Sequence, residues 1–183
     1  MQKELLEGHF DKRRLIHQSF RIEEGVTESL QKEANRKGIP LSHLVNKILK
    51  SYITSDRYFQ ELGFILVSKD LTRKILDKLE EGYLIEQGRQ FGSKIAKEYI
   101  PYFFADVNSY TLLEFLELWF SRFSFQHRID YRHHSYSINH ELGKSYSIFF
   151  KEYISVLIES IIKSSIQFSI VAENTVTFSF DLI

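Results

Sequence analysis

The first regular pattern of hydrophobic and polar positions along the chain is a short alternation that ends at residue 22. Residues 15–22 predict a strand, because from residue 17 onwards successive side chains alternate between two faces. The polar face carries His17, Ser19 and Arg21. The opposite face carries Gln18, Phe20 and Ile22. An apolar face this narrow cannot form a core, so the strand needs a partner.

Two helical patterns follow this strand. Apolar residues spaced by four predict a helix over 24–37, and Gly38 suits the left-handed residue that ends a helix after a basic last turn. Pro40 favours the first turn of a second helix. The apolar stripe of this second helix has complete i, i+3, i+4, i+7 spacing. Its members are Leu41, Leu44, Val45, Ile48, Leu49, Tyr52 and Ile53.

One strand and two helices cannot enclose a hydrophobic core by themselves. A second copy of the chain solves this problem. The two strands then pair antiparallel across a two-fold axis, and four helices bury their apolar stripes beneath the paired strands. The pattern of residues 15–57 therefore predicts a homodimer.

The pattern after residue 57 predicts the order β-α-α-α-β-β-α-β-β, which is typical of an antiparallel α+β domain. Asp70 is expected to cap the first of these helices, and Gly82 is expected to end or break it. Gly88 and Gly92 lie one turn apart and indicate close packing between helices. The remaining elements are a strand over 63–68, helices over 83–100, 109–122 and 140–163, the last capped by Asn139, and strands over 123–130, 132–138, 166–171 and 175–180.

Composition and charge divide the chain in the same way. The 183 residues are 43% hydrophobic and 26% charged, which is ordinary for a folded protein. Residues 1–57 hold 11 Lys and Arg against 8 Asp and Glu, whereas 23 of the 26 Phe and Tyr residues come later. We expect a basic arm over 1–14 that ends in Lys12, Arg13 and Arg14, a dimerising segment over 15–57, and an α+β domain over 58–183.

The absence of certain sequence features narrows the class of protein. The chain has no Cys, which excludes disulfides and thiolate metal sites. The sequence shows no signal peptide and no apolar run of about 20 residues. We therefore expect a cytoplasmic location and no membrane partner. It has no nucleophile motif and no Gly-rich loop after a strand, so neither an enzyme nor a cofactor is expected.

Residues 15–54 resemble the ribbon-helix-helix DNA-binding family of Arc and MetJ type. The residues that carry this resemblance are the strand, the glycine at the helix break and both apolar stripes. They read Phe20-Arg21-Ile22-(x)3-Val26-(x)3-Leu30-(x)3-Ala34-(x)3-Gly38-Ile39-(x)2-Ser42-(x)-Leu44-Val45.

The resemblance implies a sequence-specific transcriptional regulator whose partner is double-stranded DNA. In the family, paired strands enter the major groove, and their outward side chains, here His17, Ser19 and Arg21, contact base edges. Amides at the start of the second helix hold a DNA phosphate, and the matching positions are Leu41, Ser42 and His43. The family often has a Ser or Thr cap where this chain has Pro40, which puts the strength of that contact in doubt.

The C-terminal part offers candidates for effector binding. The run His140-Glu141-Leu142-Gly143, which opens a long helix before a terminal hairpin, resembles vinyl-reductase-like and haem–NO-binding-like sensor domains. No haem ligand can be carried over. A small-molecule effector would occupy a mostly apolar cavity, with Tyr136, His140 and Tyr146 as the polar groups that orient it. Further oligomerisation is the other role open to residues 58–183.

A group of histidines suggests an alternative, a metal-responsive repressor. His127, His133, His134 and His140 fall within 14 residues, and imidazole suits zinc, nickel or copper. Adjacent residues on a strand point to opposite faces, so His133 and His134 are not expected to share one ion. The first alternative, ahead of the metal-responsive repressor, is an antitoxin or other interaction protein whose C-terminal domain binds a protein partner.

Overall fold

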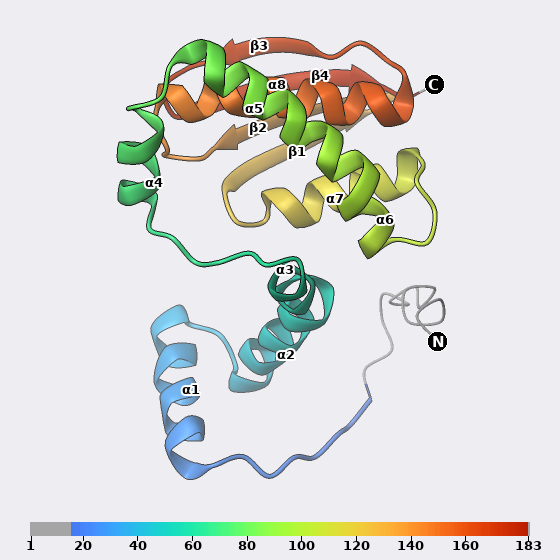
Figure 1. Ribbon diagram of the computed structural model, residues 1–183. Coiled ribbons are helices and arrows are strands. Elements are labelled where there is room, and N and C mark those ends of the chain that lie inside the picture. Colours follow the sequence, from blue (N-terminus) through green and yellow to red (C-terminus); the bar gives the residue numbers. More distant parts are fainter. Residues whose placement is uncertain (1–15, 183) are drawn as a thin grey trace. The chain divides into compact units, whose positions relative to one another are not determined.

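The computed structural model describes residues 16–182, and its first regular elements are two helices joined by a tight turn (Figure 1). Helix α1 spans Glu24–Lys37 and α2 spans Leu41–Ser51, as the apolar spacing predicts. Gly38 has φ 64° and donates its N–H to carbonyls of the last turn of α1. Pro40 directly precedes α2. The predictions for both helices and their turn are confirmed.

The predicted strand before α1 is not formed by the described residues of the single chain. Residues 16–23 have no regular secondary structure, and within the described residues they pair with no strand. A two-fold ribbon takes one strand from each of two copies, so a single chain holds only half of it. The ribbon stays a prediction.

The second helix continues beyond its apolar stripe. A π-helical turn over Tyr52–Asp56 leads into α3, Arg57–Glu61, without a break. The sequence places the junction between segments at residue 57, inside this continuous helix. The chain instead divides into two compact units after Phe64. We refer to them as the N-terminal unit, ending at Phe64, and the C-terminal unit, beginning at Ile65.

The predicted strand over 63–68 is wrong. The segment is irregular because it has no neighbouring strand to pair with, and Ile65 and Leu66 are 82% and 99% exposed. Helix α4, Lys69–Leu76, begins after it. Its N-cap is Ser68, whose side chain accepts a hydrogen bond from the Leu71 N–H, and not the predicted Asp70.

The next helical stretch is longer than predicted at both ends. Helix α5 spans Glu81–Lys94, continues through a π-helical turn, Ile95–Tyr99, and ends as α6, Ile100–Phe103. Gly82 lies in the first turn of α5, and the break falls before it, at residues 77–80. Pro101, which directly follows the predicted helix over 83–100, does not end the helix. It sits in the first turn of α6, where a missing N–H costs little.

Two glycines let α5 approach another helix closely, as the sequence indicates. A Cβ atom on Gly88 would lie 2.6 Å from the carbonyl oxygen of Phe149 in α8, Lys144–Ile162. A Cβ atom on Gly92 would collide with the backbone of Tyr153 in the same helix. Phe91, between these glycines, packs its ring against Phe149 and Tyr153.

Helix α7, Ser109–Phe120, has a capping box at its start. The Asn108 side chain accepts hydrogen bonds from the N–H groups of Tyr110 and Thr111, and the Thr111 hydroxyl accepts from the Asn108 N–H. Most of its apolar residues are buried. They are Leu112, Phe115, Leu116 and Phe120.

Four antiparallel strands form one sheet of order β1-β2-β4-β3. Two hairpins build it, and α8 connects them. The predicted strands are confirmed to within a residue or two: β1 Ser124–Asp130, β2 His133–Asn139, β3 Gln167–Val171 and β4 Thr175–Asp181. Asn139 does not cap α8, which starts only after Gly143.

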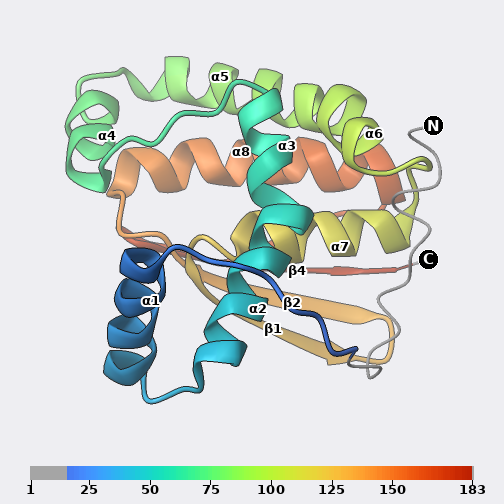
Figure 2. The same cartoon turned by 90° about the horizontal axis from the view of Figure 1, so that it is seen from below.

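The C-terminal unit is a layered α+β fold, as the order of elements predicts. Helix α8 lies between α5 and the sheet (Figure 2). The alternate residues of β2 and β4 that face it are fully or almost fully buried, because α7 and α8 cover that side of the sheet. The aromatic core includes Phe120, Tyr136, Phe150, Phe178 and Phe180.

Candidate functional site

The predicted DNA-reading residues lie together in one exposed segment. His17, Ser19 and Arg21 are all exposed in the irregular stretch that leads into α1. Nothing in the described residues covers their side chains, so all three remain accessible to a ligand. The basic residues Lys12, Arg13 and Arg14 lie outside the described residues.

The predicted phosphate-binding amides lie at the start of α2. Leu41 is half-buried, whereas Ser42 and His43 are exposed. The N–H of His43 donates to the carbonyl oxygen of Pro40 over 3.0 Å, so this amide is already used within the chain. The first N–H groups of a helix have no acceptor inside it, which leaves Leu41 and Ser42 as the better phosphate donors.

The N-terminal unit exposes an unusual amount of apolar side chain. Ala34 in α1 and Leu44 in α2 are the only buried residues of these two helices. Large apolar side chains around them are between two-fifths and two-thirds exposed. They are Phe20, Ile22, Val26, Ile48, Leu49, Tyr52 and Ile53. One copy of these helices therefore leaves its apolar stripe in water.

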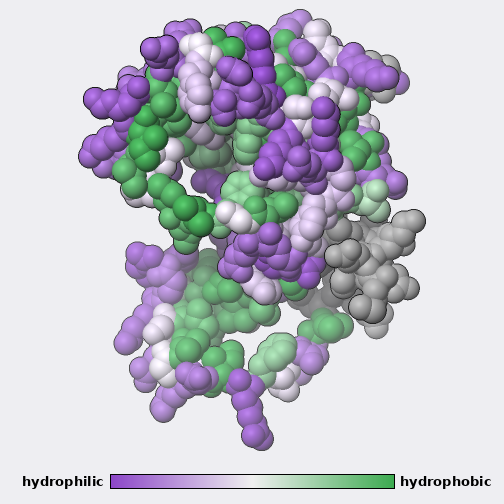
Figure 3. Space-filling view, in the orientation of Figure 1, coloured by the Kyte–Doolittle hydropathy of each residue, from purple (hydrophilic) through white to green (hydrophobic). Residues whose placement is uncertain are grey.

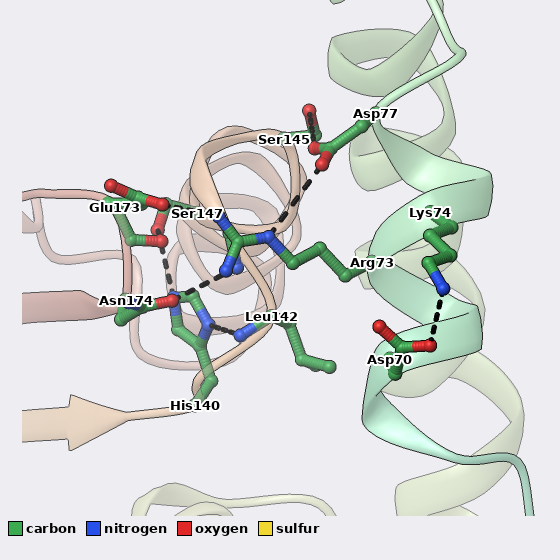
Figure 4. A network of polar contacts seen from close by, with 11 residues as sticks. Asp70, Arg73, Lys74, Asp77, His140, Leu142, Ser145, Ser147, Glu173 and Asn174 are labelled. Atoms are coloured by element: carbon green, nitrogen blue, oxygen red, sulfur yellow. Dashed lines mark hydrogen bonds and ion pairs between the residues drawn. The ribbon is translucent and has the colours of Figure 1, made fainter.

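In the C-terminal unit, His140 is a buried residue with both ring nitrogens in use (Figure 4). Its Nδ1 accepts the Leu142 N–H over 3.0 Å, so its proton is on Nε2, which donates to the Ser147 hydroxyl over 2.8 Å. Ser147 in turn donates to the carbonyl oxygen of Ala172. Burial, with a smaller effect from the charge of Lys69, lowers the pKa of His140 to about 4. The imidazole is neutral near pH 7 and joins the loop after β2 to the β3–β4 turn.

A polar network around His140 fastens α4 to the rest of the C-terminal unit (Figure 4). Arg73 in α4 forms ion pairs with Asp77 and with Glu173 in the β3–β4 turn. Asp77 also accepts a hydrogen bond from Ser145 at the start of α8 over 2.9 Å. The turn itself is held by Asn174, whose side chain accepts the Gly143 N–H. Helix α4 thus contacts the two loops that flank His140.

The three predicted ligand-orienting residues fall into two clusters. The ring of Tyr146 packs edge-on against His140, with 4.8 Å between ring centroids. Tyr136 instead stacks on His127, at 3.9 Å and nearly parallel. Burial raises the pKa of both tyrosine hydroxyls. Their role in binding an effector stays a prediction.

The four histidines do not form a common metal site. His127 lies between Glu117 and His134, with its Nδ1 2.5 Å from the carboxylate and its Nε2 2.9 Å from Nδ1 of His134. His133 points to the other face of the sheet, as predicted, and pairs with Asp181. Over residues 16–182, no group of three or more His, Asp or Glu side chains is arranged to hold a metal ion.

Several residues in these clusters could not have been found by local sequence patterns. Glu117 meets His127 across the α7–β1 connection, and Arg73 meets Glu173 a hundred residues later. Sequence spacing gives no signal for such pairs.

On the outer face of the sheet, a shallow pocket of about 150 Å³ is smaller than the ~300 Å³ at which small-molecule sites begin. It is lined by Ser124, Phe125, Gln126, Ser137 and Asn139.

Comparisons with known proteins give no match to this chain among protein-family models, curated proteins or solved structures. Among the described helices, none is both long and apolar enough to cross a membrane.

Proposed function

We propose that this chain is a homodimeric, sequence-specific DNA-binding transcriptional regulator. Residues 15–22 of two copies pair into a ribbon that enters the major groove, and the C-terminal unit senses an effector, adds oligomer contacts, or does both.

The observation that carries this proposal is the exposed apolar surface of α1 and α2. Val26 and Ile48 are each 46% exposed in a single chain, and Phe20, in the segment before α1, is 66% exposed. Apolar surface of this extent, close to a polar segment with His17, Ser19 and Arg21, is what a two-fold strand-helix-helix dimer buries. The same pairing places the polar strand faces side by side on the outside, where DNA can reach them.

The decisive experiment is selection of bound DNA from a random library with the full chain. A two-fold ribbon selects a symmetric or tandem motif, and the spacing of its half-sites gives the geometry of the dimer. Recovery of random sequences with a strong salt dependence would mean backbone binding only. No enrichment at all would reject the DNA-binding function.

Arg21 tests the reading face directly. Its guanidinium can contact guanine O6 and N7 with two hydrogen bonds, so Arg21→Ala is expected to cost about 1–3 kcal/mol of specific binding and to relax preference at one base pair. Lys32→Ala removes the same charge from an exposed position of α1 and serves as the control. Equal losses of DNA affinity in the two variants, measured by fluorescence anisotropy, would show that only the positive charge of Arg21 contributes to binding.

The basic arm tests the non-specific part of binding. Deletion of residues 1–14, which contain Lys12, Arg13 and Arg14, is expected to weaken all DNA sequences alike and to flatten the dependence of affinity on salt. A changed sequence preference would place base readout in the arm.

An effector of the C-terminal unit would be detected by thermal melting of the full chain with a panel of metabolites and metals. A ligand present at 100 times its dissociation constant adds ~2.7 kcal/mol of stability. A shift that survives a chelator supports an organic effector, and a shift that a chelator abolishes supports the metal alternative. No shift with any compound leaves oligomerisation as the role of this unit.

A further inference from the structure

Helix α4 adds no buried side chain to the C-terminal unit. Its apolar residues are Leu71, Ile75 and Leu76, of which the first two are 50% and 53% exposed and the third is half-buried. Figure 3 shows hydrophobic side chains along α4 on the surface. A helix at the surface of a domain is normally held there by burial of its apolar side. In α4 this source of attachment is weak.

Polar side chains attach α4 to the rest of the unit instead. The links join α4, or the residue directly after it, to loops and to a helix start that lie far away in the sequence. They include Lys69 with Glu141 after β2, Arg73 with Glu173 in the β3–β4 turn, and Asp77 with Ser145 at the start of α8. The side chains of the two ion pairs are between 42% and 63% exposed. Ion pairs this exposed stabilise little and are screened by salt.

The length of α4 and its flanks also favour local opening. The helix has eight residues, and a helix this short is not stable by itself in water. Residues 62–68 before it and 77–80 after it form turns or irregular structure, so neither flank holds it in place. Helix α8, by contrast, buries residues along its whole length, from Ser147 to Ile162. Opening of α4 therefore requires much less free energy than unfolding of the core.

We propose that α4 is a salt-sensitive strap, which detaches from the C-terminal unit while α5, α7, α8 and the sheet stay folded. Detachment lengthens the chain that connects the two units. With α4 attached, the free chain from Glu61 to Lys69 spans at most about 28 Å. With α4 detached, the free chain runs from Glu61 to Glu81 and spans at most about 70 Å. The inference does not depend on DNA binding or on a dimer.

Hydrogen exchange measured by mass spectrometry on the full chain tests the strap. Raising the NaCl concentration from about 0.05 to 1 M is expected to accelerate exchange in α4 at least about threefold relative to α8. Equal exchange in α4 and α8 at every salt concentration would overturn the proposal, since α4 would then open only with the whole unit. Exchange in α4 as fast as in a free peptide, already at low salt, would overturn it too, because α4 would not be attached.

A matched pair of variants tests the ion pairs. Arg73→Gln removes a link to the β3–β4 turn, whereas Lys74→Gln removes an ion pair with Asp70 inside α4. Arg73→Gln is expected to accelerate exchange in α4 at low salt and to reduce the further effect of NaCl. Lys74→Gln is expected to leave exchange in α4 close to that of the wild type. Equal acceleration in the two variants would mean that the helix itself frays, and the strap would be rejected.

Glu173→Gln removes the same link from the other side and keeps the sequence of α4 unchanged. It is expected to accelerate exchange in α4 as well, with no change in α8. An unchanged fluorescence spectrum of Trp119, the only Trp, shows that the C-terminal unit is folded in each variant. Acceleration that extends to α8 in Glu173→Gln would overturn the independent opening of α4.

Small-angle X-ray scattering tests the longer connection. At low salt and equal concentration, Arg73→Gln is expected to have a larger radius of gyration than Lys74→Gln, with the same oligomeric state in sedimentation. An equal radius of gyration, beside faster exchange in α4 of Arg73→Gln, would overturn the lengthening of the connection.

Discussion

Gly88 and Gly92 set the distance between α5 and α8. At each position a Cβ atom would meet backbone of α8, and a helix backbone cannot move aside as a side chain can. The rings of Phe91, Phe149 and Tyr153 pack at the same contact. The layer formed by these two helices therefore depends on two residues without side chains.

Gly92→Ala is expected to destabilise the C-terminal unit by about 1–3 kcal/mol, because the added methyl group forces α5 away from α8. Gly82→Ala is the control. Its Cβ would meet nothing within 4 Å, and replacing a helical glycine by alanine is expected to add about 0.4–1 kcal/mol. Urea unfolding followed by Trp119 fluorescence measures both. Equal effects of the two variants would contradict the close approach of the helices.

His140 links stability to pH. Its pKa is about 4 in the folded chain and about 6.5 when unfolded, so the unfolded state binds the proton more tightly. The contribution of His140 to the free energy of unfolding is fully present above about pH 6.5 and is lost progressively as the pH falls from 6.5 to 4. The loss amounts to about 3 kcal/mol.

His140→Gln is expected to flatten this part of the dependence of unfolding free energy on pH. His133→Gln, on the exposed end of β2, provides the comparison. Urea unfolding at pH 7.5, 6, 5 and 4 gives the four free energies for each protein. A wild-type curve with the same slope as that of His140→Gln would show that the imidazole is not held neutral.

Among the elements, α7 and α8 begin in different ways. Asn108 caps α7 through hydrogen bonds to two N–H groups, whereas Asn139, which the sequence suggests as the cap of α8, lies four residues before Gly143. The loop between Asn139 and α8 is set by His140 and Asn174, which bind its backbone.

Asn108→Ala is therefore expected to lower the stability of the C-terminal unit by about 1 kcal/mol through loss of the cap. Asn139→Ala, a change of the same chemistry, is expected to have less than half this effect. Both are read from the midpoint of urea unfolding. A larger loss of stability in Asn139→Ala than in Asn108→Ala would mean that Asn139 caps α8, as the sequence suggests.

Local patterns identify most elements because their determinants lie within one turn or one hairpin. The spacing of apolar residues with Gly38 and Pro40 defines α1 and α2, and alternation defines β1 to β4. The errors occur where distant contacts decide. Residues 63–68 have strand-like composition but no strand beside them, and Pro101 is accommodated at the start of α6 after a π-helical turn.

The candidate sites are less predictable than the elements for the same physical reason. The prediction that His133 and His134 point to opposite faces of the sheet is correct, because it follows from the local alternation of side chains along a strand. The contact of His140 with Ser147 depends on how α8 lies against the sheet, and the contact of His127 with Glu117 depends on how α7 does. Spacing along the chain carries no information on that packing.

At the scale of the whole molecule, the two units differ in how much of their own core they supply. The C-terminal unit buries aromatic residues from α6, α7, α8 and the sheet. In the N-terminal unit, α1 and α2 together bury only Ala34 and Leu44. The stability of a unit that completes its core with a second copy depends on protein concentration, whereas the stability of a unit with its own core does not.

The fragment 1–64 is therefore expected to melt at a temperature that rises with protein concentration, by several degrees between 1 and 100 μM. Circular dichroism at 222 nm follows the loss of its helices. Val26→Asp places a charge in the apolar surface and is expected to abolish the transition, because an unpaired charge cannot be buried in the dimer. Gln31→Asp puts the same charge on the opposite, exposed side of α1 and is expected to keep it. A melting temperature that stays constant over this range, with Val26→Asp as stable as Gln31→Asp, would mean that α1 and α2 fold without a second copy, and the dimeric ribbon would have to be abandoned.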